Sequence, residues 1–364
     1  MPAHAHNNRR RRQRRSMGTT LVTTAVVGYG AYRLAEWLWS SDEDDNHHDD
    51  PEEEGIFSAL GSWMSSTMMR NSWGQQQQQQ RYSPSSPQQQ PRLDPRTQWK
   101  LRRQRVFKCR EESIKACQTC WPALTENIEE MTNTSAAMRK LRDLRASKDG
   151  HSDDLWKEIY VETLTRFLSC VYAHGLWFSM STVQIHYVGG RMFRQVPPLE
   201  DDEKSMLTES HQYMLQHGLN RLVPMIRKTI LPFIDEWKAT TTISKIELHQ
   251  LIRKVQSTID ATFSTQNNNK YARNWIRFVL PDDSVDEVWD ICQSPVWDDA
   301  HSHLLNDTID ILLSSPEENG EEEIAVAKHM APLKKSCPKL SLPENYQRWI
   351  AMPAMLELGD VSFQ

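Results

Sequence analysis

The spacing that most clearly suggests a chemical function in this sequence is that of Cys117 and Cys120, which form a C-x-x-C pair. Such a pair serves redox chemistry between a strand and a helix, and it binds zinc when a second pair is present. Here the surrounding pattern is helical, no second pair occurs, and Cys109 supplies at most a third thiol. We therefore expect these thiols to lie on a helix face, with no metal and no cofactor.

Other catalytic patterns are absent from the sequence. No G-x-x-x-x-G-K-[ST], G-x-G-x-x-G, G-x-S-x-G or H-E-x-x-H motif occurs. His301, His303 and Asp307 could be built into a metal site, but they fit the start of a solvated helix better. The sequence gives no catalytic residue, and we predict that the chain is not an enzyme.

The composition is that of a polar, slightly acidic chain of 364 residues, with 38% hydrophobic residues and a net charge of −5. A general nucleic-acid-binding protein is usually basic overall, so no nucleic-acid partner is expected. A mean hydropathy of −0.67 argues against a multi-span transporter. Six cysteines are too few for a disulfide scaffold at this length. We therefore expect the cysteines to be reduced, as in a protein that faces the cytosol.

Residues 1–40 have the pattern of a basic segment followed by a single membrane anchor. An uncharged stretch runs from Ser16 to Tyr32. Extended as a helix to Trp39, the segment would measure about 36 Å, more than a hydrocarbon core of about 30 Å. The predicted targeting residues are Arg9, Arg10, Arg11, Arg12, Arg14 and Arg15. The predicted anchor residues are Leu21, Val22, Val26, Val27, Trp37 and Trp39.

Three alternatives to an anchor remain open. Residues 1–33 are rich in arginine and poor in acidic residues, as in a cleaved mitochondrial presequence. The arginines alone fit a nuclear-localisation or nucleic-acid patch. The whole segment could also be a disordered tail.

Residues 41–96 are predicted to be a disordered linker. Nine carboxylates lie within residues 42–54, and residues 75–95 are rich in Gln, Pro and Ser. Such segments repel themselves or lack the apolar side chains needed for a core. Between them, residues 56–68 carry one apolar stripe at helical spacing, which would contact a membrane interface or a partner.

Residues 97–364 are predicted to fold as one all-α domain, a single large elongated helical bundle. Sustained period-2 alternation and Asn-Gly or Asp-Gly hairpin turns are missing, whereas helical spacing recurs. Pro122 should interrupt or kink a helix, and Gly189-Gly190 should end one. The expected helices are 97–121, 123–147, 152–190, 199–235, 244–265, 299–315, 320–336 and 343–358.

The helix expected after Ser152 or Asp153 contains 22 positions, Phe167 to Val188, without Asp, Glu, Lys or Arg. By length this stretch could be a second membrane span. Its scattered polar residues, His174 and Gln184 among them, instead favour the centre of a large bundle. Trp156 stands in the first turn of the same helix, with Ile159 on the same face. It is either a core-edge aromatic residue or an exposed anchor for a partner helix.

The chain resembles the peroxin-3 family of peroxisomal membrane protein biogenesis factors at these residues. The clearest match runs without gaps from Trp156 to Gly190. Weaker matches are Trp121-Pro122-Ala-Leu124, the segment from Pro197-Pro198 to Ile226, and Ala327-Lys328-x-x-x-Pro332, which has one residue more than the family's pattern. The likeness covers about residues 97–335 by sequence, and residues 9–40 by arrangement only.

The resemblance implies a non-enzymatic receptor whose helical domain is held in the cytosol on the peroxisomal membrane. Its partner would be peroxin-19, a soluble chaperone whose N-terminal amphipathic helix enters an apolar groove. The family's groove tryptophan falls on Trp156, a groove leucine on Ile159 and a groove lysine on Lys328. Leu141 and Leu144 are weaker candidates for the groove wall.

The chain departs from the family in residues 41–96, which look like an insertion, and in the poorly matching end after Pro332. The membrane topology that the sequence predicts conflicts with that of the family. The positive-inside rule would keep the N-terminal arginines in the cytosol, whereas the family places its N-terminus in the peroxisomal matrix. The competing functional hypothesis is a membrane-anchored helical enzyme or redox protein that uses Cys117 and Cys120.

Overall fold

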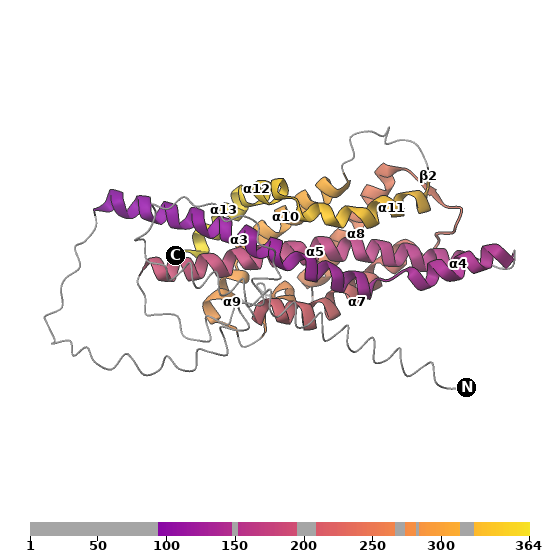
Figure 1. The fold of residues 1–364 in the computed structure, drawn as a ribbon, viewed down its shortest axis with the longest axis horizontal. Helices are drawn as coiled ribbons and strands as arrows, with labels where there is room; N and C mark the ends of the chain where they lie inside the picture. The colour runs from indigo at the N-terminus through magenta and orange to yellow at the C-terminus, as the bar shows by residue number, and fades with distance from the viewer. Residues whose placement is uncertain (1–93, 148–151, 195–208, 266–273, 282–283, 314–323) are drawn as a thin grey trace, which may run out of the picture. The chain divides into compact units, whose positions relative to one another are not determined.

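The computed structural model describes residues 94–147, 152–194, 209–265, 274–281, 284–313 and 324–364 (Figure 1). The predicted targeting arginines, membrane anchor, linker and 56–68 stripe lie outside these residues. The described residues divide into two units. One comprises residues 94–103, the first turns of helix α3, and the other comprises residues 104–364, whose fold is as follows.

The expectation of an all-α body is confirmed for the described residues. The α-helices are α3 (Pro95–Met131), α4 (Ser135–Ser147), α5 (Asp153–Phe193), α7 (Leu219–Ile230), α8 (Lys245–Thr265), α9 (Asp286–Cys292), α10 (Pro295–Leu313), α11 (Val326–Ser336), α12 (Pro343–Ile350) and α13 (Pro353–Ser362). Short helical turns are Met214–Gly218, Leu231–Phe233, Asn274–Phe278 and Cys337–Ser341. The strands β1 (Thr242–Ile243) and β2 (Ile324–Ala325) form one antiparallel pair.

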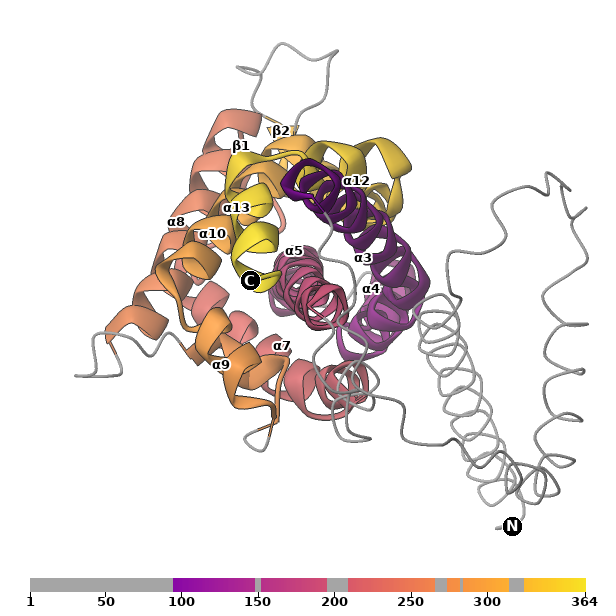
Figure 2. The ribbon, with the colours of Figure 1, turned by 90° about the vertical axis from the view of Figure 1, so that its left-hand side faces the viewer.

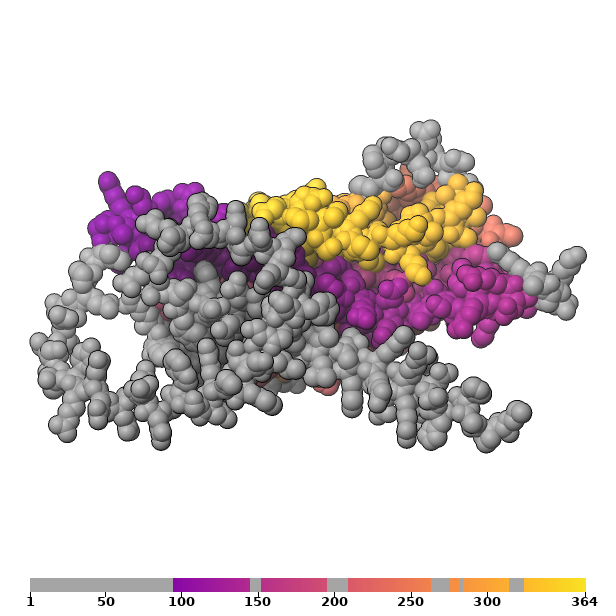
Figure 3. Space-filling view, in the orientation of Figure 1, coloured from indigo at the N-terminus to yellow at the C-terminus, as the bar shows by residue number. Residues whose placement is uncertain are grey.

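Helix α5 lies at the centre of the unit and the other helices surround it (Figure 2). Every residue from Ile159 to Gly190 is buried except Glu162. An isolated helix with an apolar surface on all sides would be insoluble, so its neighbours must cover the full circumference. Figure 3 shows one side of this cover, formed by α3, α4 and the C-terminal segment from α11 to α13. The sequence-based placement of this helix in a bundle core is therefore confirmed.

The buried face of α5 also holds polar groups. His174 is almost fully buried, and its ring packs edge-on against Trp121 at a centroid distance of 5.1 Å and tilted against Trp349 at 4.6 Å. Neither ring nitrogen has a hydrogen-bond partner among the described residues. Burial lowers the pKa of His174 to about 3, because a charged imidazole would lose its hydration there. The folded chain therefore holds His174 neutral.

Of the two effects predicted for Pro122, an interruption of the helix is wrong, because α3 continues through Pro122 and ends at Met131. Two arginines fix the true end of the helix. Arg166 of α5 donates to the carbonyl oxygens of Glu129 and Thr132 at 3.2 and 3.1 Å, and Arg227 of α7 donates to that of Met131 at 2.9 Å. The last carbonyls of a helix lack internal partners, so these guanidinium groups satisfy them and favour termination here.

The predicted stop at Gly189-Gly190 is also wrong, because α5 continues to Phe193. The two glycines instead permit close packing. A Cβ at Gly190 would overlap the carbonyl oxygen of Phe363, and one at Gly189 would overlap Sγ of Cys109. The glycine pair therefore lets the C-terminal end of the chain and α3 approach the backbone of α5.

Smaller differences concern the second half of the chain. The expected helix 244–265 is confirmed as α8, whose start is a capping box in which Ser244 and Glu247 bond each other's backbone amides at 3.1 and 2.7 Å. The expected helix 343–358 is instead two helices, because Pro353 begins α13. Neither α9 nor the β1–β2 pair was predicted from the sequence pattern. None of the described helices is both long and apolar enough to cross a membrane.

Replacing Gly190 by alanine tests the close approach of the Phe363 backbone to α5. Gly190→Ala places a Cβ 2.8 Å from the carbonyl carbon of Phe363, so we expect the free energy of unfolding to fall by about 3 kcal/mol in urea titrations. Gly175→Ala in the same helix is the control. Its Cβ meets side-chain atoms only, Leu305 Cδ2 at 2.9 Å and His301 Cε1 at 3.2 Å, and alanine's helix propensity offsets about 1 kcal/mol, so the net loss should be smaller than for a clash with backbone. Equal losses would contradict this account.

The buried neutral imidazole predicts a pH dependence of stability. The pKa of His174 is about 3 in the folded chain and 6.5 in the reference state, so the unfolded chain binds the proton first as pH falls. The stability present above pH 6.5 is therefore lost progressively below it, by about 2 kcal/mol between pH 7 and 5. His174→Phe keeps the aromatic contacts but cannot bind the proton. In urea titrations, its free energy of unfolding should therefore fall by about 2 kcal/mol less than that of the wild type between pH 7 and 5. An unchanged pH dependence would show that His174 is hydrated.

Candidate functional site

The residues predicted for partner binding gather largely where α4 packs against the first turns of α5. The buried core there consists of Ala137, Leu141 and Ile159, with exposed fractions of 1%, 3% and 6%. Three half-buried apolar side chains pack around it: Met138, Leu155 and Trp156. We call these six residues the α4–α5 cluster. It joins three of the five predicted residues, namely Leu141, Trp156 and Ile159, into one surface.

Trp156 continues into a row of aromatic side chains. Its ring stacks on Tyr160 at a centroid distance of 5.7 Å, and Tyr160 meets Trp237 edge-on at 5.9 Å. Tyr160 is fully buried, and burial together with the nearby Asp153 carboxylate raises the pKa of its hydroxyl. Rings packed in this way hold one another in place, so Trp156 is supported from beneath while part of it faces solvent.

Polar contacts fix the loop after α7 against the start of α5. The backbone amide of Ala239 donates to the Asp153 carboxylate at 3.1 Å. The Lys157 ammonium pairs with the Asp235 carboxylate and donates to its backbone carbonyl at 3.2 Å. These bonds place Trp237 beside Tyr160, a proximity that no local pattern in the sequence could reveal.

Lys328 lies at the same end of the unit as the α4–α5 cluster. The amide of Val326 donates to the carbonyl of Thr241 at 3.0 Å, and a nitrogen of His329 lies 3.0 Å from the carbonyl of Ile243. The start of α11 is thereby tied to the loop that also contacts Asp153. Lys328 itself is exposed. It is not a member of the cluster, and neither is Leu144, which is half-buried one turn beyond Leu141.

The cluster depends on the direction in which α4 leaves α3. Arg166 is buried and forms an ion pair with Glu129 at 2.8 Å while it bonds the end of α3. Arg227 forms a bidentate pair with Glu162 at 2.7 and 2.8 Å beside it. Asn133 accepts from the amide of Ser135 at 2.8 Å and so begins α4. These contacts set the corner between the two helices and hold α4 against α5.

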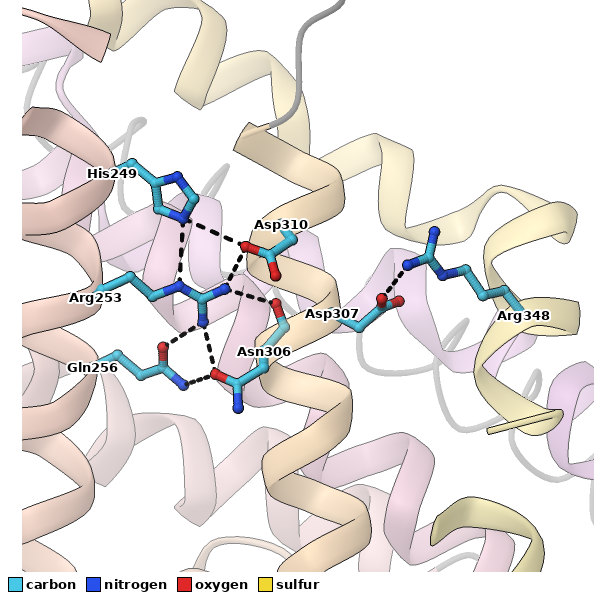
Figure 4. A network of polar contacts seen from close by, with 7 residues as sticks. All are labelled: His249, Arg253, Gln256, Asn306, Asp307, Asp310 and Arg348. Atoms are coloured by element: carbon cyan, nitrogen blue, oxygen red, sulfur yellow. Dashed lines mark hydrogen bonds and ion pairs between the residues drawn. The ribbon is translucent and has the colours of Figure 1, made fainter. Parts of the chain in front are cut away.

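The His301, His303 and Asp307 group has a structural role in the described residues. The expectation of a solvated helix start is wrong for His301, which is buried and stacked on Trp297 at 4.9 Å. Asp307 pairs with Arg348 (Figure 4). It also accepts a hydrogen bond from Trp349 Nε1 at 3.0 Å. Among the described residues, no three His, Cys, Asp or Glu side chains are arranged to hold a metal ion.

A second polar network joins α8 to α10 (Figure 4). Arg253 donates to the side-chain oxygens of Gln256 and Asn306 at 2.9 and 2.7 Å and pairs with Asp310. His249 lies 3.4 Å from the same carboxylate. Because Arg253 bridges two helices through several partners, its role is to fix the packing of α8 on α10.

The C-x-x-C cysteines lie within α3 and face the core. All six cysteines of the chain are buried and unpaired by disulfides. Burial raises the pKa of Cys120 to about 12 and that of Cys117 well above its usual range. A reactive thiol needs a lowered pKa and solvent access, so neither residue has the environment of a redox nucleophile.

Comparison with known proteins agrees with the sequence resemblance. The chain is 20% identical over 207 residues to peroxisomal biogenesis factor 3 of Bos taurus and 21% identical over 206 residues to that of Mus musculus. The human protein gives 20% over 207 residues. The chain is distantly similar to the peroxisomal biogenesis factor 3 proteins of several mammals. No protein-family model matches it.

The similarity to peroxisomal biogenesis factor 3 covers only part of each protein. Each match covers 53% of this chain and 54% of the relative, so the chain spans about half the length of the curated relatives it matches. The relatives' name describes a biogenesis factor. The sequence predicted a binding role for Trp156, Ile159 and Leu141, and this role stays a prediction; it did not indicate Trp237 or Leu155, which lie beside them. Leu155 could have been found from the apolar residues at the start of α5, whereas Trp237 could not.

Thiol labelling tests the burial of the cysteines. The pKa of Cys109 and of Cys120 is raised to about 12 from 9.0, so at pH 8 their thiolate fraction is lower by roughly a thousandfold. We expect iodoacetamide to label these thiols in the folded chain slower by at least that factor than in the urea-unfolded chain, as measured by mass spectrometry. Rapid labelling of Cys117 or Cys120 alone would instead support the redox hypothesis.

Proposed function

We propose that this chain acts in peroxisome biogenesis as a docking receptor that binds the N-terminal amphipathic helix of peroxin-19. The receptor would serve the insertion of peroxisomal membrane proteins and would not itself be an enzyme. The observation that carries the proposal is the half-buried Trp156 on a prebuilt apolar surface, in a chain related to peroxisomal biogenesis factor 3. The proposed binding surface is the α4–α5 cluster together with Lys328.

The surface has the chemistry that a helix-in-groove contact requires. Met138, Leu155 and Trp156 are half-buried, so each still offers apolar area that an incoming helix could cover. Leu141 and Ile159 are buried beneath them and hold the surface together. An amphipathic helix buries its apolar face at residues three and four apart, and a central aromatic residue typically supplies most of the binding energy. Trp156 is the candidate for that central residue.

The exposed Lys328 would add specificity at the edge of this surface. The residue lies on the first turn of α11, whose start is tied to the loop that contacts the first turn of α5. A charge at a rim changes the association rate and the choice of partner more than the affinity. We propose that Lys328 attracts an acidic side chain of the partner helix, and that Leu144 extends the apolar surface.

The proposed location is the peroxisomal membrane, with residues 1–40 as a single-pass anchor and residues 97–364 in the cytosol. The arginines at 9–15 would act as a targeting signal, and the lipids around the anchor would be those of the peroxisomal membrane. N-terminal sequencing of the mature chain distinguishes this from a cleaved mitochondrial presequence. An intact N-terminus supports the anchor, and loss of about the first 33 residues would contradict it.

Replacing Trp156 tests the proposed function. Truncating a central aromatic contact typically costs about 2 kcal/mol or more, so Trp156→Ala should weaken binding of a peroxin-19 N-terminal peptide by well over tenfold. Isothermal titration calorimetry with the full chain measures this affinity. The circular dichroism spectrum should stay unchanged, because Trp156 is only half-buried.

Trp99→Ala is the matched control for that experiment. Trp99 is 59% exposed on α3, and it lies outside the α4–α5 cluster, so its truncation should leave peptide affinity unchanged. If both variants bind normally, the site assignment is wrong. If the wild-type chain binds no peroxin-19 peptide at all, the proposed function is wrong.

A further inference from the structure

The first turns of α3 carry a second surface with a different chemistry. Residues 96–110 contain seven basic residues and no acidic one. Within the same stretch, Trp99 and Phe107 have exposed fractions of 59% and 58%. Large aromatic side chains are normally covered in a soluble domain, so two of them among cations call for a physical explanation.

The spacing places these residues on one face of the helix. Arg96, Lys100, Arg103 and Phe107 follow one another at intervals of three or four, which is the repeat of a single α-helical stripe, whereas Arg110 is half-buried and faces Asp360 at 3.9 Å. Trp99 belongs to the same stripe, because it is four residues before Arg103, and the Arg103 guanidinium lies over its ring at 5.4 Å. We call Arg96, Trp99, Lys100, Arg103 and Phe107 the α3 stripe.

The helix buries a different face. The first buried residues of α3 are Val106 and Cys109, which lie about 100° or more around the helix axis from Lys100 and Phe107, whereas Trp99 lies near the edge of the buried face and is still 59% exposed. The burial of Val106 and Cys109 therefore leaves Phe107 exposed on another side of the helix. The stripe combines cations with an exposed aromatic pair, which is the composition of a helix that lies in a membrane interface.

We propose that the α3 stripe binds an anionic lipid surface. Basic side chains would contact the headgroup phosphates, and Trp99 and Phe107 would enter the boundary between headgroups and acyl chains. The acidic segment 42–54 of the same chain could also neutralise the cations. That segment contains no apolar side chain apart from Pro51, so it would leave both aromatic rings exposed. A bilayer supplies both kinds of contact, and it is the occupant that fits the whole stripe.

This surface is independent of peroxin-19 binding, because it lies on α3 and shares no residue with the α4–α5 cluster. Its test is hydrogen–deuterium exchange of the full chain mixed with vesicles. One set of vesicles contains phosphatidylcholine alone, and the other contains phosphatidylcholine with about a third phosphatidylserine. We expect the exchange of residues 95–107 to slow by roughly tenfold with the anionic vesicles only.

Variants assign the effect to the stripe. The double variant Trp99→Ala/Phe107→Ala and the double variant Lys100→Glu/Arg103→Glu should each lose the slowing, and the effect in the wild type should weaken at high salt. The control is Ile246→Ala/Leu342→Ala, which removes two exposed apolar side chains on other elements and should retain it. Equal exchange with both kinds of vesicle would overturn the proposal. Protection that needs no vesicle and disappears when the carboxylates of 42–54 are replaced by amides would also overturn it, in favour of the acidic segment.

Discussion

The burial of α5 on all sides is the constraint on which the rest of the fold depends. A helix without charge from Phe167 to Val188 can be stable in water only if other helices enclose it, and α4, α7, α10, α11 and α13 do so. The enclosure is close enough that glycine is needed where the chain end meets α5 at Gly190. The same enclosure buries His174, and this burial keeps its imidazole neutral.

The same helix also positions the proposed partner surface. Arg166 stands in its buried stretch and pairs with Glu129 while it bonds the last carbonyls of α3. A buried guanidinium without such partners would be strongly destabilising, so the corner between α3 and α4 is coupled to the packing of α5. That corner directs α4 along the first turns of α5 and creates the α4–α5 cluster. The central helix therefore links the core to Trp156 at the surface.

Sequence reasoning predicted the helical class and the central helix because both follow from periodicity and from the absence of charge. It failed at Pro122 and at Gly189-Gly190 because it assigned local meanings to residues whose roles are set by distant partners. Pro122 is tolerated within α3, and the helix ends where Arg166 and Arg227 supply hydrogen bonds. The site was predictable only in part for the same reason. Trp156 and Ile159 were predicted from their position on one helix face and from a family resemblance, whereas Trp237 reaches Tyr160 through a loop about eighty residues away.

The central claim is that Trp156 marks the surface where the partner helix binds. Photo-crosslinking tests it most directly, with a photoreactive phenylalanine analogue introduced at position 156 of the full chain and, in a second preparation, at the exposed Leu342. With peroxin-19 present, the account predicts a crosslink from position 156 to its N-terminal helix and none from position 342. Crosslinking that is absent at position 156, or equal at both positions, would contradict it.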